Sequence, residues 1–490
     1  MFPEHIPTLL DSKIITSESL TFKKKLDDKK IVLLGSDPKA NIRQAVFLGK
    51  ICEANQSLSY NGYNVFVDTG FPSVIMIYGV RGTGKSYTLG DITEGLISDE
   101  GEVSHGSSDN ALVLFDTLGH FWQMTHPPPD SEEEHHSILR NWGLTAGGFD
   151  NLRVFVPKGY PRADPSWEEL ALAYSDMEID DWCGVLDTNR YDKPLGQLLS
   201  DAYRKVVETG WNEIDFDADG NQIAVGRVDA NPNYSIDNLI HCIQKDEGIR
   251  SDTNGFDIST IRALTSRLSA IRDANIFDVN GTPIEEIFVR GSLSVIKMNK
   301  ISDDLKALIA GLITKKIFRY REEGKEQEEL SRIRGEDINP ETIFPKGWIL
   351  IDEAHNYCPT TGSNASKDWI IKYAKEGRSL GLGMIGTTQQ PAALDGRLTS
   401  QVNILVCHSL SFARDIQSAA DRMLNLGLKQ VRIENESYET SVLENVLRSL
   451  ENGEALISSR DSNRVFVCRI RPRIAAHGGG HPQNVDQEDA

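Results

Sequence analysis

Val-Ile-Met-Ile-Tyr-Gly-Val-Arg-Gly-Thr-Gly-Lys-Ser, residues 74–86, is the stretch that decides the fold. Its first five residues are apolar and predict a buried strand. The glycines that follow let consecutive backbone N–H groups turn inward around phosphate oxygens, Lys85 supplies a point charge, and the Ser86 hydroxyl suits a magnesium ion. Residues 87–92 are compatible with a helix, whose N-terminus would also face the phosphates. The sequence therefore predicts a site for a nucleoside triphosphate and Mg2+, formed by Gly79, Arg81, Gly82, Thr83, Gly84, Lys85, Ser86 and Tyr87.

Length, charge and cysteine usage limit the class of protein. A chain of 490 residues exceeds the size of a single core and predicts two or three domains. Its net charge of −20 makes the surface as a whole repel nucleic acid, so any DNA contact must be local. The six cysteines are far apart and form no Cys-x-x-Cys pair, which argues against a zinc site and a disulfide framework. The N-terminus lacks a signal-peptide pattern and no apolar stretch approaches roughly 18 residues, so we expect a cytoplasmic chain without a membrane segment.

Apolar runs alternate with helical patterns through much of the chain. The runs at 74–78, 111–115 and 152–156 are followed by segments of helical periodicity, which is typical of a parallel sheet in an α/β fold. A long amphipathic helix is expected over 303–323. It leads into a charged stretch, 321–337, which is either a solvated helix face or an exposed loop.

The remaining segments differ in composition from this α/β pattern. Residues 161–289 interrupt the alternation with acidic and aromatic-containing segments, which predicts a mainly helical insertion. Residues 1–70 contain short β-like runs and a Lys-rich patch, which predicts a short β-rich N-terminal region. Residues 475–490 are Gly-rich and then acidic, as in a flexible tail. The α/β core would then consist of residues 71–160 and 290–474.

A second chemical motif follows the apolar run Trp348-Ile349-Leu350-Ile351. Asp352 and Glu353 come directly after this run. One carboxylate at a strand end can support a magnesium ion, and the next can polarise an attacking water, so the pair predicts hydrolysis. Carboxylate pairs also occur at ordinary strand ends on protein surfaces. The phosphate loop in the same α/β pattern favours the catalytic interpretation.

A third strand-like run, 382–388, leads to Gln389. An amide at the carboxyl edge of a neighbouring strand can donate to the γ-phosphate or to the attacking water, which makes Gln389 the predicted sensor. Upstream, Arg378 ends a helical segment, and its guanidinium can reach a phosphate across a subunit boundary. The alternative is that Arg378 balances the dipole at the helix C-terminus.

Together these residues resemble the HerA/FtsK superfamily of hexameric DNA-pumping P-loop ATPases, and the HerA branch most closely. The resemblance covers about residues 60–475, and its most selective part is Asp-Glu followed by a helix Arg and then Thr-Gln-x-Pro. The matching segments, in family order, are 79–88, 116–121, a strand-helix unit beginning at 293–296, the Asp-Glu-Ala-His motif 352–355, Arg378 with 387–391, and a closing hairpin at 450–457.

This resemblance implies a RecA-like P-loop NTPase core in a ring, usually of six subunits, with ATP at each interface and DNA in the central pore. Lys85 and Ser86 would bind the phosphates and Mg2+, Asp352 would support the metal, and Glu353 would be the general base. Gln389 would sense the γ-phosphate. Arg378 would act in trans as an arginine finger, which makes hydrolysis depend on assembly.

Two features depart from the family pattern. Many HerA-like proteins have Glu where this chain has His120, and we expect this histidine to be a surface or packed residue. Only about 70 residues precede the phosphate loop, so the N-terminal β-barrel that commonly docks a partner nuclease in the family is abbreviated. Contacts with DNA in the pore would come from loops in 140–160 and 296–306. These loops contain Arg153, Lys158, Lys297 and Lys300, for which solvated surface charge is the alternative.

The leading functional hypothesis is an ATP-driven DNA translocase or helicase that acts with a partner nuclease or another effector, in antiphage defence or DNA-end processing. The alternative is an ATP-dependent ring scaffold that assembles and gates a partner enzyme. Thr388-Gln389-Gln390-Pro391 argues against a protein-remodelling ATPase, since such enzymes more often have Asn there. The roughly 270 residues between Lys85 and Asp352 argue against a small-molecule kinase.

Overall fold

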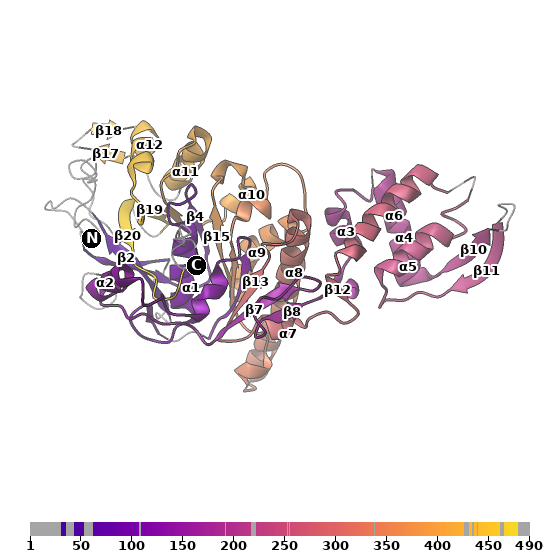
Figure 1. Ribbon diagram of the computed structural model, residues 1–490, viewed down its shortest axis with the longest axis horizontal. Coiled ribbons are helices and arrows are strands. Elements are labelled where there is room, and N and C mark those ends of the chain that lie inside the picture. Colours follow the sequence, from indigo (N-terminus) through magenta and orange to yellow (C-terminus); the bar gives the residue numbers. More distant parts are fainter. Residues whose placement is uncertain are drawn as a thin grey trace, which may run out of the picture.

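Strand β4 (Val74–Tyr78), which precedes the phosphate loop, lies inside a large sheet (Figure 1). The Lys-rich patch and residues 479–490 of the predicted tail lie outside the residues that the structure describes. The computed structural model describes residues 31–35, 44–52, 62–106, 109–191, 193–216, 222–251, 253, 255–337, 339–425, 431–433, 436–438, 440–460 and 465–478.

The middle of this sheet is parallel. Among the described residues, eight neighbouring strands in the order β16-β4-β15-β14-β6-β13-β7-β8 all run in the same direction. Tyr78 pairs with Thr388, and Ile351 pairs with Phe115, so the carboxyl ends of these strands share one edge. The strands besides β4 are β6 (Ala111–Asp116), β7 (Leu152–Pro157), β8 (Glu168–Leu170), β13 (Leu293–Lys297), β14 (Gly347–Ile351), β15 (Leu382–Thr388) and β16 (Ile404–Cys407).

The other side of the sheet is mostly antiparallel and includes the N-terminal strands. β19 pairs antiparallel with β16, and β20, β2 and β3 continue outward, with β1 parallel to β3 at the end. The described part of residues 1–70 thus extends the central sheet, and the boundary predicted at residue 70 stays a prediction. These strands are β1 (Ile31–Leu34), β2 (Ala45–Ile51), β3 (Asn64–Asp68), β5 (Ser104–His105), β19 (Glu454–Ser459) and β20 (Phe466–Ile470).

Helices cover both faces of the sheet. Successive residues of each apolar strand point to opposite faces, so both faces are apolar and both are buried. Ile75 and Ile77 of β4 pack in one apolar cluster with residues of α1 (Lys85–Ile97). Met76 packs in a second cluster with residues of α8 (Asp303–Arg334), α9 (Lys367–Leu380) and α11 (Ala413–Asn425). The continuous apolar runs of the sequence are explained by this burial on both sides.

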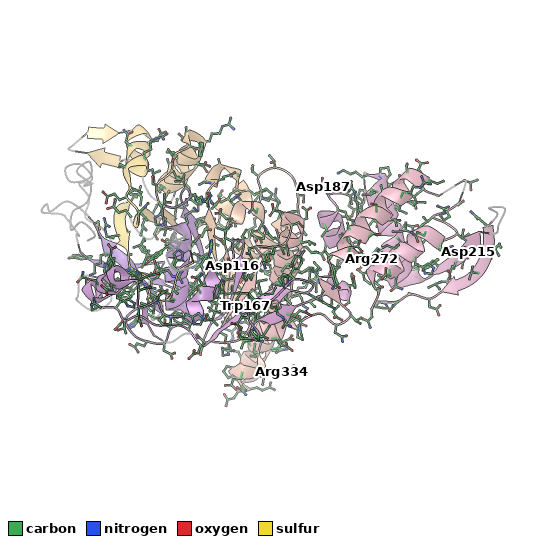
Figure 2. The ribbon with its side chains drawn as sticks, in the orientation of Figure 1. Asp116, Trp167, Asp187, Asp215, Arg272 and Arg334 are labelled. Atoms are coloured by element: carbon green, nitrogen blue, oxygen red, sulfur yellow. The ribbon has the colours of Figure 1, made fainter. Side chains whose placement is uncertain are left out.

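Helix α8 is longer than the predicted 303–323. It continues through the charged stretch to Arg334 and ends at Gly335, whose φ of 68° is left-handed. Its last turns extend away from the sheet, with Arg334 at the end farthest from the body (Figure 2). The charged stretch is therefore mostly a solvated helix face.

Most of residues 161–289 projects from the α/β body as a helix-rich unit, although β8 of this range belongs to the central sheet (Figure 1). Its base is attached to α8 by Lys315, which is buried and donates to Asp181 over 2.7 Å. An antiparallel hairpin, which the sequence analysis did not predict, occupies its far end near Asp215 (Figure 2). The elements here are β9 (Leu172–Ala173), α3 (Ile179–Val185), α4 (Pro194–Arg204), a π-helical turn (Lys205–Thr209), β10 (Trp211–Phe216), β11 (Gln222–Val228), α5 (Ile236–Lys245), α6 (Ile258–Asp273), β12 (Phe277–Asp278) and α7 (Ile284–Ile287).

Short elements complete the described chain. None of its described helices is both long enough and apolar enough to span a bilayer. The remaining helices and strands are α2 (Glu133–Trp142), α10 (Gly396–Thr399), β17 (Val431–Ile433), β18 (Glu436–Tyr438) and α12 (Thr440–Ser449), with 3-10 turns at Phe121–Thr125, Tyr174–Asp176, Pro340–Thr342, Ala354–Asn356 and Pro391–Ala393.

Candidate active site

The phosphate loop connects the carboxyl end of β4 to the N-terminus of α1. Gly82 and Gly84 have φ values of 82° and 111°, which favour glycine because L side chains rarely adopt them. The Lys85 ammonium is folded onto the loop and donates to the Val80 carbonyl over 2.9 Å. Burial lowers the pKa of Lys85, and the carboxylates of Glu353 and Asp352 raise it in part. The loop therefore holds a buried cation at a helix N-terminus, as an anion site requires.

His408 forms the floor beneath this loop. Its ring is fully buried and links Thr88 Oγ1, 2.9 Å from Nε2, to the Glu454 carbonyl, 2.8 Å from Nδ1. Burial lowers the pKa of His408 to about 4, so the ring is neutral at pH 7. The carbonyl can only accept, so Nδ1 carries the proton and Nε2 accepts from Thr88. A side chain at Gly79 would meet His408 Cβ at 2.8 Å, which explains why glycine opens the loop.

Asp352 and Glu353 follow β14 and lie next to the loop. Ser86 Oγ is 3.5 Å from Asp352 Oδ1, although 266 positions separate the two residues in sequence. Burial, together with the neighbouring carboxylates of Glu353 and Asp116, raises the pKa of Asp352 to about 7. Glu353 is buried and has a left-handed backbone, with φ 58° and ψ 55°. Such conformations in residues other than glycine are concentrated at functional sites.

The residues present fit a magnesium ion. Asp352 Oδ2 is buried and has no hydrogen-bond partner among the described residues. A buried carboxylate oxygen without a donor is costly, and a cation would satisfy it. The Ser86 hydroxyl, 3.5 Å from the other carboxylate oxygen Oδ1, supplies a second oxygen of the type that Mg2+ prefers.

Gln389 and His355 surround the Glu353 carboxylate. The Gln389 side-chain amide donates to Glu353 Oε1, and its backbone N–H donates to Oε2 over 3.3 Å. His355 Nδ1 lies 3.4 Å from the same carboxylate, and burial lowers its pKa. A cavity of about 480 Å3 adjoins Glu353, and it is lined by Thr117, Leu118, Asn299, Lys306, Glu353, His355, Asn356, Gln389 and Gln390.

Residues 116–121, at the end of β6, support this site. The buried Asp116 carboxylate accepts the backbone N–H groups of Gly119, His120 and Phe121 over 2.7–3.1 Å. The Thr117 hydroxyl donates to the Asp352 carbonyl over 2.8 Å. Asp116 thus fixes a turn, and the structure places His120 in that turn at the start of the 3-10 segment Phe121–Thr125.

Arg378 lies at the opposite edge of the sheet from the phosphate loop. It is exposed in the last turn of α9, just before β15 begins, and its guanidinium covers the Phe71 ring at 5.1 Å. Phe71 precedes β4, whereas the loop follows it. A five-residue strand at about 3.3 Å per residue separates the two edges by roughly 15 Å. Arg378 is therefore not brought together with Lys85 within one chain.

Two other predicted nucleotide contacts differ in their surroundings. Arg81 is exposed on the loop. The Tyr87 hydroxyl accepts the Arg473 backbone N–H over 2.7 Å, and its ring meets His477 edge-on. Residues 471–478, here called the C-terminal strap, therefore lie against Tyr87 and α1. The predicted contact between Tyr87 and the nucleotide stays a prediction.

The basic residues predicted to contact DNA divide into two kinds. Arg153 donates to Glu168 over 2.7 Å, and Lys158 is paired with Asp278. Lys297 donates to Asn299 Oδ1 over 2.9 Å beside the Trp167 ring, and Lys300 is exposed. Carboxylates thus compensate the charges of Arg153 and Lys158, while Lys297 ends β13 and Lys300 follows it at the carboxyl edge of the sheet.

Three residues of the site were missed by sequence reasoning: Thr117, Thr387 and His408. His408 follows the apolar run Ile404–Cys407, so the rule that identified Gln389, a polar residue at the carboxyl end of a buried strand, would have found it. Thr387 lies one residue inside β15, where only the unusual polarity of a buried strand marks it.

Comparisons with known proteins agree with this geometry. A solved structure described as the plasmid coupling protein TrwB in complex with the ATP analogue ADPNP is similar over 92% of this chain and 98% of that chain, with a TM-score of 0.50 and 13% identity. This likeness concerns the fold alone. The predicted α/β fold, a RecA-like P-loop core with a mainly parallel sheet, is confirmed.

Sequence relatives and a family match narrow the assignment. The DNA double-strand break repair helicases HerA of Saccharolobus solfataricus and Sulfurisphaera tokodaii are each 24% identical, over 41% and 49% of this chain. The chain spans only 35% and 42% of the length of these two relatives. Residues 73–317, half of the chain, match the family described as "Helicase HerA, central domain". The chain therefore belongs to the HerA helicase central-domain family.

Proposed function

We propose that this chain hydrolyses ATP and uses the energy to move DNA, as a HerA-like translocase or helicase. The observation that carries the proposal is the meeting of Lys85 and Ser86 with Asp352 and Glu353 at one edge of the sheet. A phosphate loop alone only binds a nucleotide. A buried carboxylate pair beside it supplies a metal ligand and a base, which hydrolysis requires.

Each residue has a defined task in this proposal. The loop amides and the Lys85 ammonium hold the β- and γ-phosphates, and Ser86 and Asp352 hold the metal. Bound Mg2+ would neutralise phosphate charge and orient the γ-phosphate. Glu353 accepts a proton from the attacking water, while Gln389 orients the Glu353 carboxylate to which it donates. A γ-phosphate would compete for the Gln389 amide, which is the proposed sensing step.

We further propose a ring, with six subunits as the family resemblance implies, and ATP at each interface. The position of Arg378 supports this arrangement, because an exposed arginine at the far edge of the sheet can complete only another subunit's site. A guanidinium supplied in trans would stabilise charge on the transferred phosphoryl group.

DNA in the pore and a partner nuclease or other effector belong to the same proposal. The relatives are named as helicases of DNA double-strand break repair, which supports DNA-end processing, and antiphage defence is the other proposed setting. A net charge of −20 confines DNA contact to a few local cations such as Lys297 and Lys300.

The experiment that tests this function compares Glu353→Gln with the wild-type protein. We expect ATP hydrolysis that DNA stimulates in the wild type, and a loss of hydrolysis with retained ATP binding in the variant, since only the base is removed. Phosphate release and fluorescent-nucleotide binding would measure the two properties. Glu326→Gln on the exposed end of α8 is the matched control and should keep the wild-type rate. An assembled wild-type ring without a DNA response, and without DNA binding at low salt, would contradict the motor proposal.

The pairing of Arg153 and Lys158 with carboxylates favours a second function. With fewer free cations for DNA, the chain could serve as an ATP-dependent ring scaffold that assembles and gates a partner enzyme. A partner that remains active on assembled Glu353→Gln rings would support the scaffold over the motor.

A further inference from the structure

The hydroxyl of Thr387 lies between the two carboxylate residues of the site. Thr387 is fully buried in β15, next to the strand that ends at Asp352. Its Oγ1 is 2.9 Å from Asp352 Oδ1 and 3.0 Å from the backbone nitrogen of Glu353. One side chain therefore contacts both the proposed metal ligand and the proposed base.

The directions of these two hydrogen bonds follow from the groups involved. A backbone N–H can only donate, so the Thr387 oxygen accepts from Glu353. The single hydroxyl proton is then given to Asp352 Oδ1. This leaves the buried Oδ2 as the Asp352 oxygen without a donor in the described structure, while Ser86 Oγ lies 3.5 Å from Oδ1. Thr387 thus selects which oxygen of Asp352 is available to a cation.

The second bond holds Glu353 in an unfavourable backbone conformation. At φ 58°, a residue with a β-carbon is strained, and such strain persists only where neighbouring groups fix it. The Thr387 oxygen receives the N–H of this strained residue. The same backbone turn directs the Glu353 carboxylate to Gln389 and to the 480 Å3 cavity.

A purely structural role explains the hydroxyl poorly. Strands buried on both faces of a parallel sheet are usually rich in Val, Ile and Leu, and Val has the same shape as Thr. The buried Thr314 hydroxyl of α8, by contrast, has no partner among the described residues, so Thr314 offers a control without such contacts.

We propose that Thr387 is a positioning residue for hydrolysis, which aims Asp352 at the metal and Glu353 at the attacking water. The proposal rests on the proposed ATPase function. Thr387 acts through Asp352 and Glu353, the two residues that its hydroxyl contacts. Groups that orient metal ligands in this way typically contribute 10- to 100-fold to metal affinity or activity.

The test uses Thr387→Val, Thr387→Ser and Thr314→Val in the full chain. We expect Thr387→Val to lower kcat about 10- to 100-fold with little change in KM, since the phosphate loop is intact. Binding of Mn2+ in the presence of ADP, followed by electron paramagnetic resonance, should weaken by a similar factor. Thr387→Ser should restore both properties, because it keeps the hydroxyl. Thr314→Val removes a buried hydroxyl that has no partner in the described part of the chain, and it should match the wild type.

Several results would overturn the proposal. Thr387→Val with wild-type kcat and Mn2+ affinity would show that the hydroxyl is dispensable, and an equally impaired Thr387→Ser would show that the methyl group matters instead. If Thr387→Val does not fold, Thr387→Cys, of similar size but a weak donor, takes its place with the same expectations. An inactive wild-type protein would refute the proposed ATPase function, while Mn2+ binding by the variants would still decide the role of Thr387.

Discussion

At the scale of single residues, His408 shows how much of the phosphate loop depends on a group outside it. The ring joins α1, through Thr88, to β19, through Glu454, and fills the space beneath Gly79 and Gly84. A neutral imidazole suits this position because it offers one donor and one acceptor. The loop thus rests on a packed, uncharged support while its outer side carries the charge of Lys85.

We expect His408→Ala to lower the free energy of unfolding by about 1–3 kcal/mol or more. The substitution leaves the Thr88 hydroxyl and the Glu454 carbonyl buried without the partner that His408 supplies. Urea denaturation would measure this loss, and fluorescent-nucleotide binding should weaken with it. His105→Ala, at an exposed histidine, is the control and should change neither. Unchanged nucleotide binding by a folded His408→Ala protein would contradict a supporting role.

At the scale of elements, the C-terminal strap ties the end of the chain to α1. Arg471 and Arg473 donate to the buried Glu94 over 2.9 and 3.0 Å. His477 accepts from Arg473 over 2.9 Å. The helix that begins at the phosphate loop is therefore held by residues almost 400 positions later.

The strap predicts a pH-dependent stability. Burial, with Arg473, His120 and His135 nearby, lowers the pKa of His477 to about 3, below the value of about 6.5 in an unfolded chain. As pH falls below 6.5, the unfolded state takes up a proton that the folded state does not, so stability is lost. We expect the fall in Tm between pH 7.5 and 4.5 to be smaller in His477→Asn, which keeps an acceptor. Equal falls in wild type and variant would rule out this contribution, and His105→Asn should behave like the wild type.

The elements also show what sequence can predict. The core strands β4, β6, β7, β13, β14 and β15 were found because each is a continuous apolar run, whereas β16 was not predicted. The site residues Asp352, Glu353 and Gln389 were found because they follow such runs. The hairpin β10–β11 was missed because β11 is almost fully exposed and β10 buries Trp211 and Ile214 without a continuous apolar run. Thr387 was missed because its role depends on how β15 pairs with β14, which periodicity does not encode, whereas His408 could have been found at the carboxyl end of an apolar run.

At the scale of the whole molecule, the site is incomplete if Arg378 acts between subunits. We expect Arg378→Ala to assemble and bind ATP but to hydrolyse it poorly, since the transition state loses a cation while the loop is unchanged. Lys85→Ala should also be inactive, because it loses the phosphate contact.

Mixing the two inactive proteins gives the decisive measurement. In a mixed ring, some interfaces combine an intact Lys85 from one subunit with an intact Arg378 from the next, so ATPase activity should return. Each variant alone is the control. If subunits exchange in a mass measurement and no activity returns, Arg378 does not act in trans.

The strand order of the sheet has a consequence for the synthesis of the protein. β4, which precedes the phosphate loop, is flanked by β15 and β16, whose residues are added to the chain more than 300 positions later. At about 5–20 residues per second, a ribosome needs roughly 15–60 s to reach them. During that interval the loop exists without the strands that hold it, and residues 161–289 are completed before those strands are made. The capacity to bind a nucleotide is therefore acquired only near the end of translation, and a prematurely terminated chain lacks it.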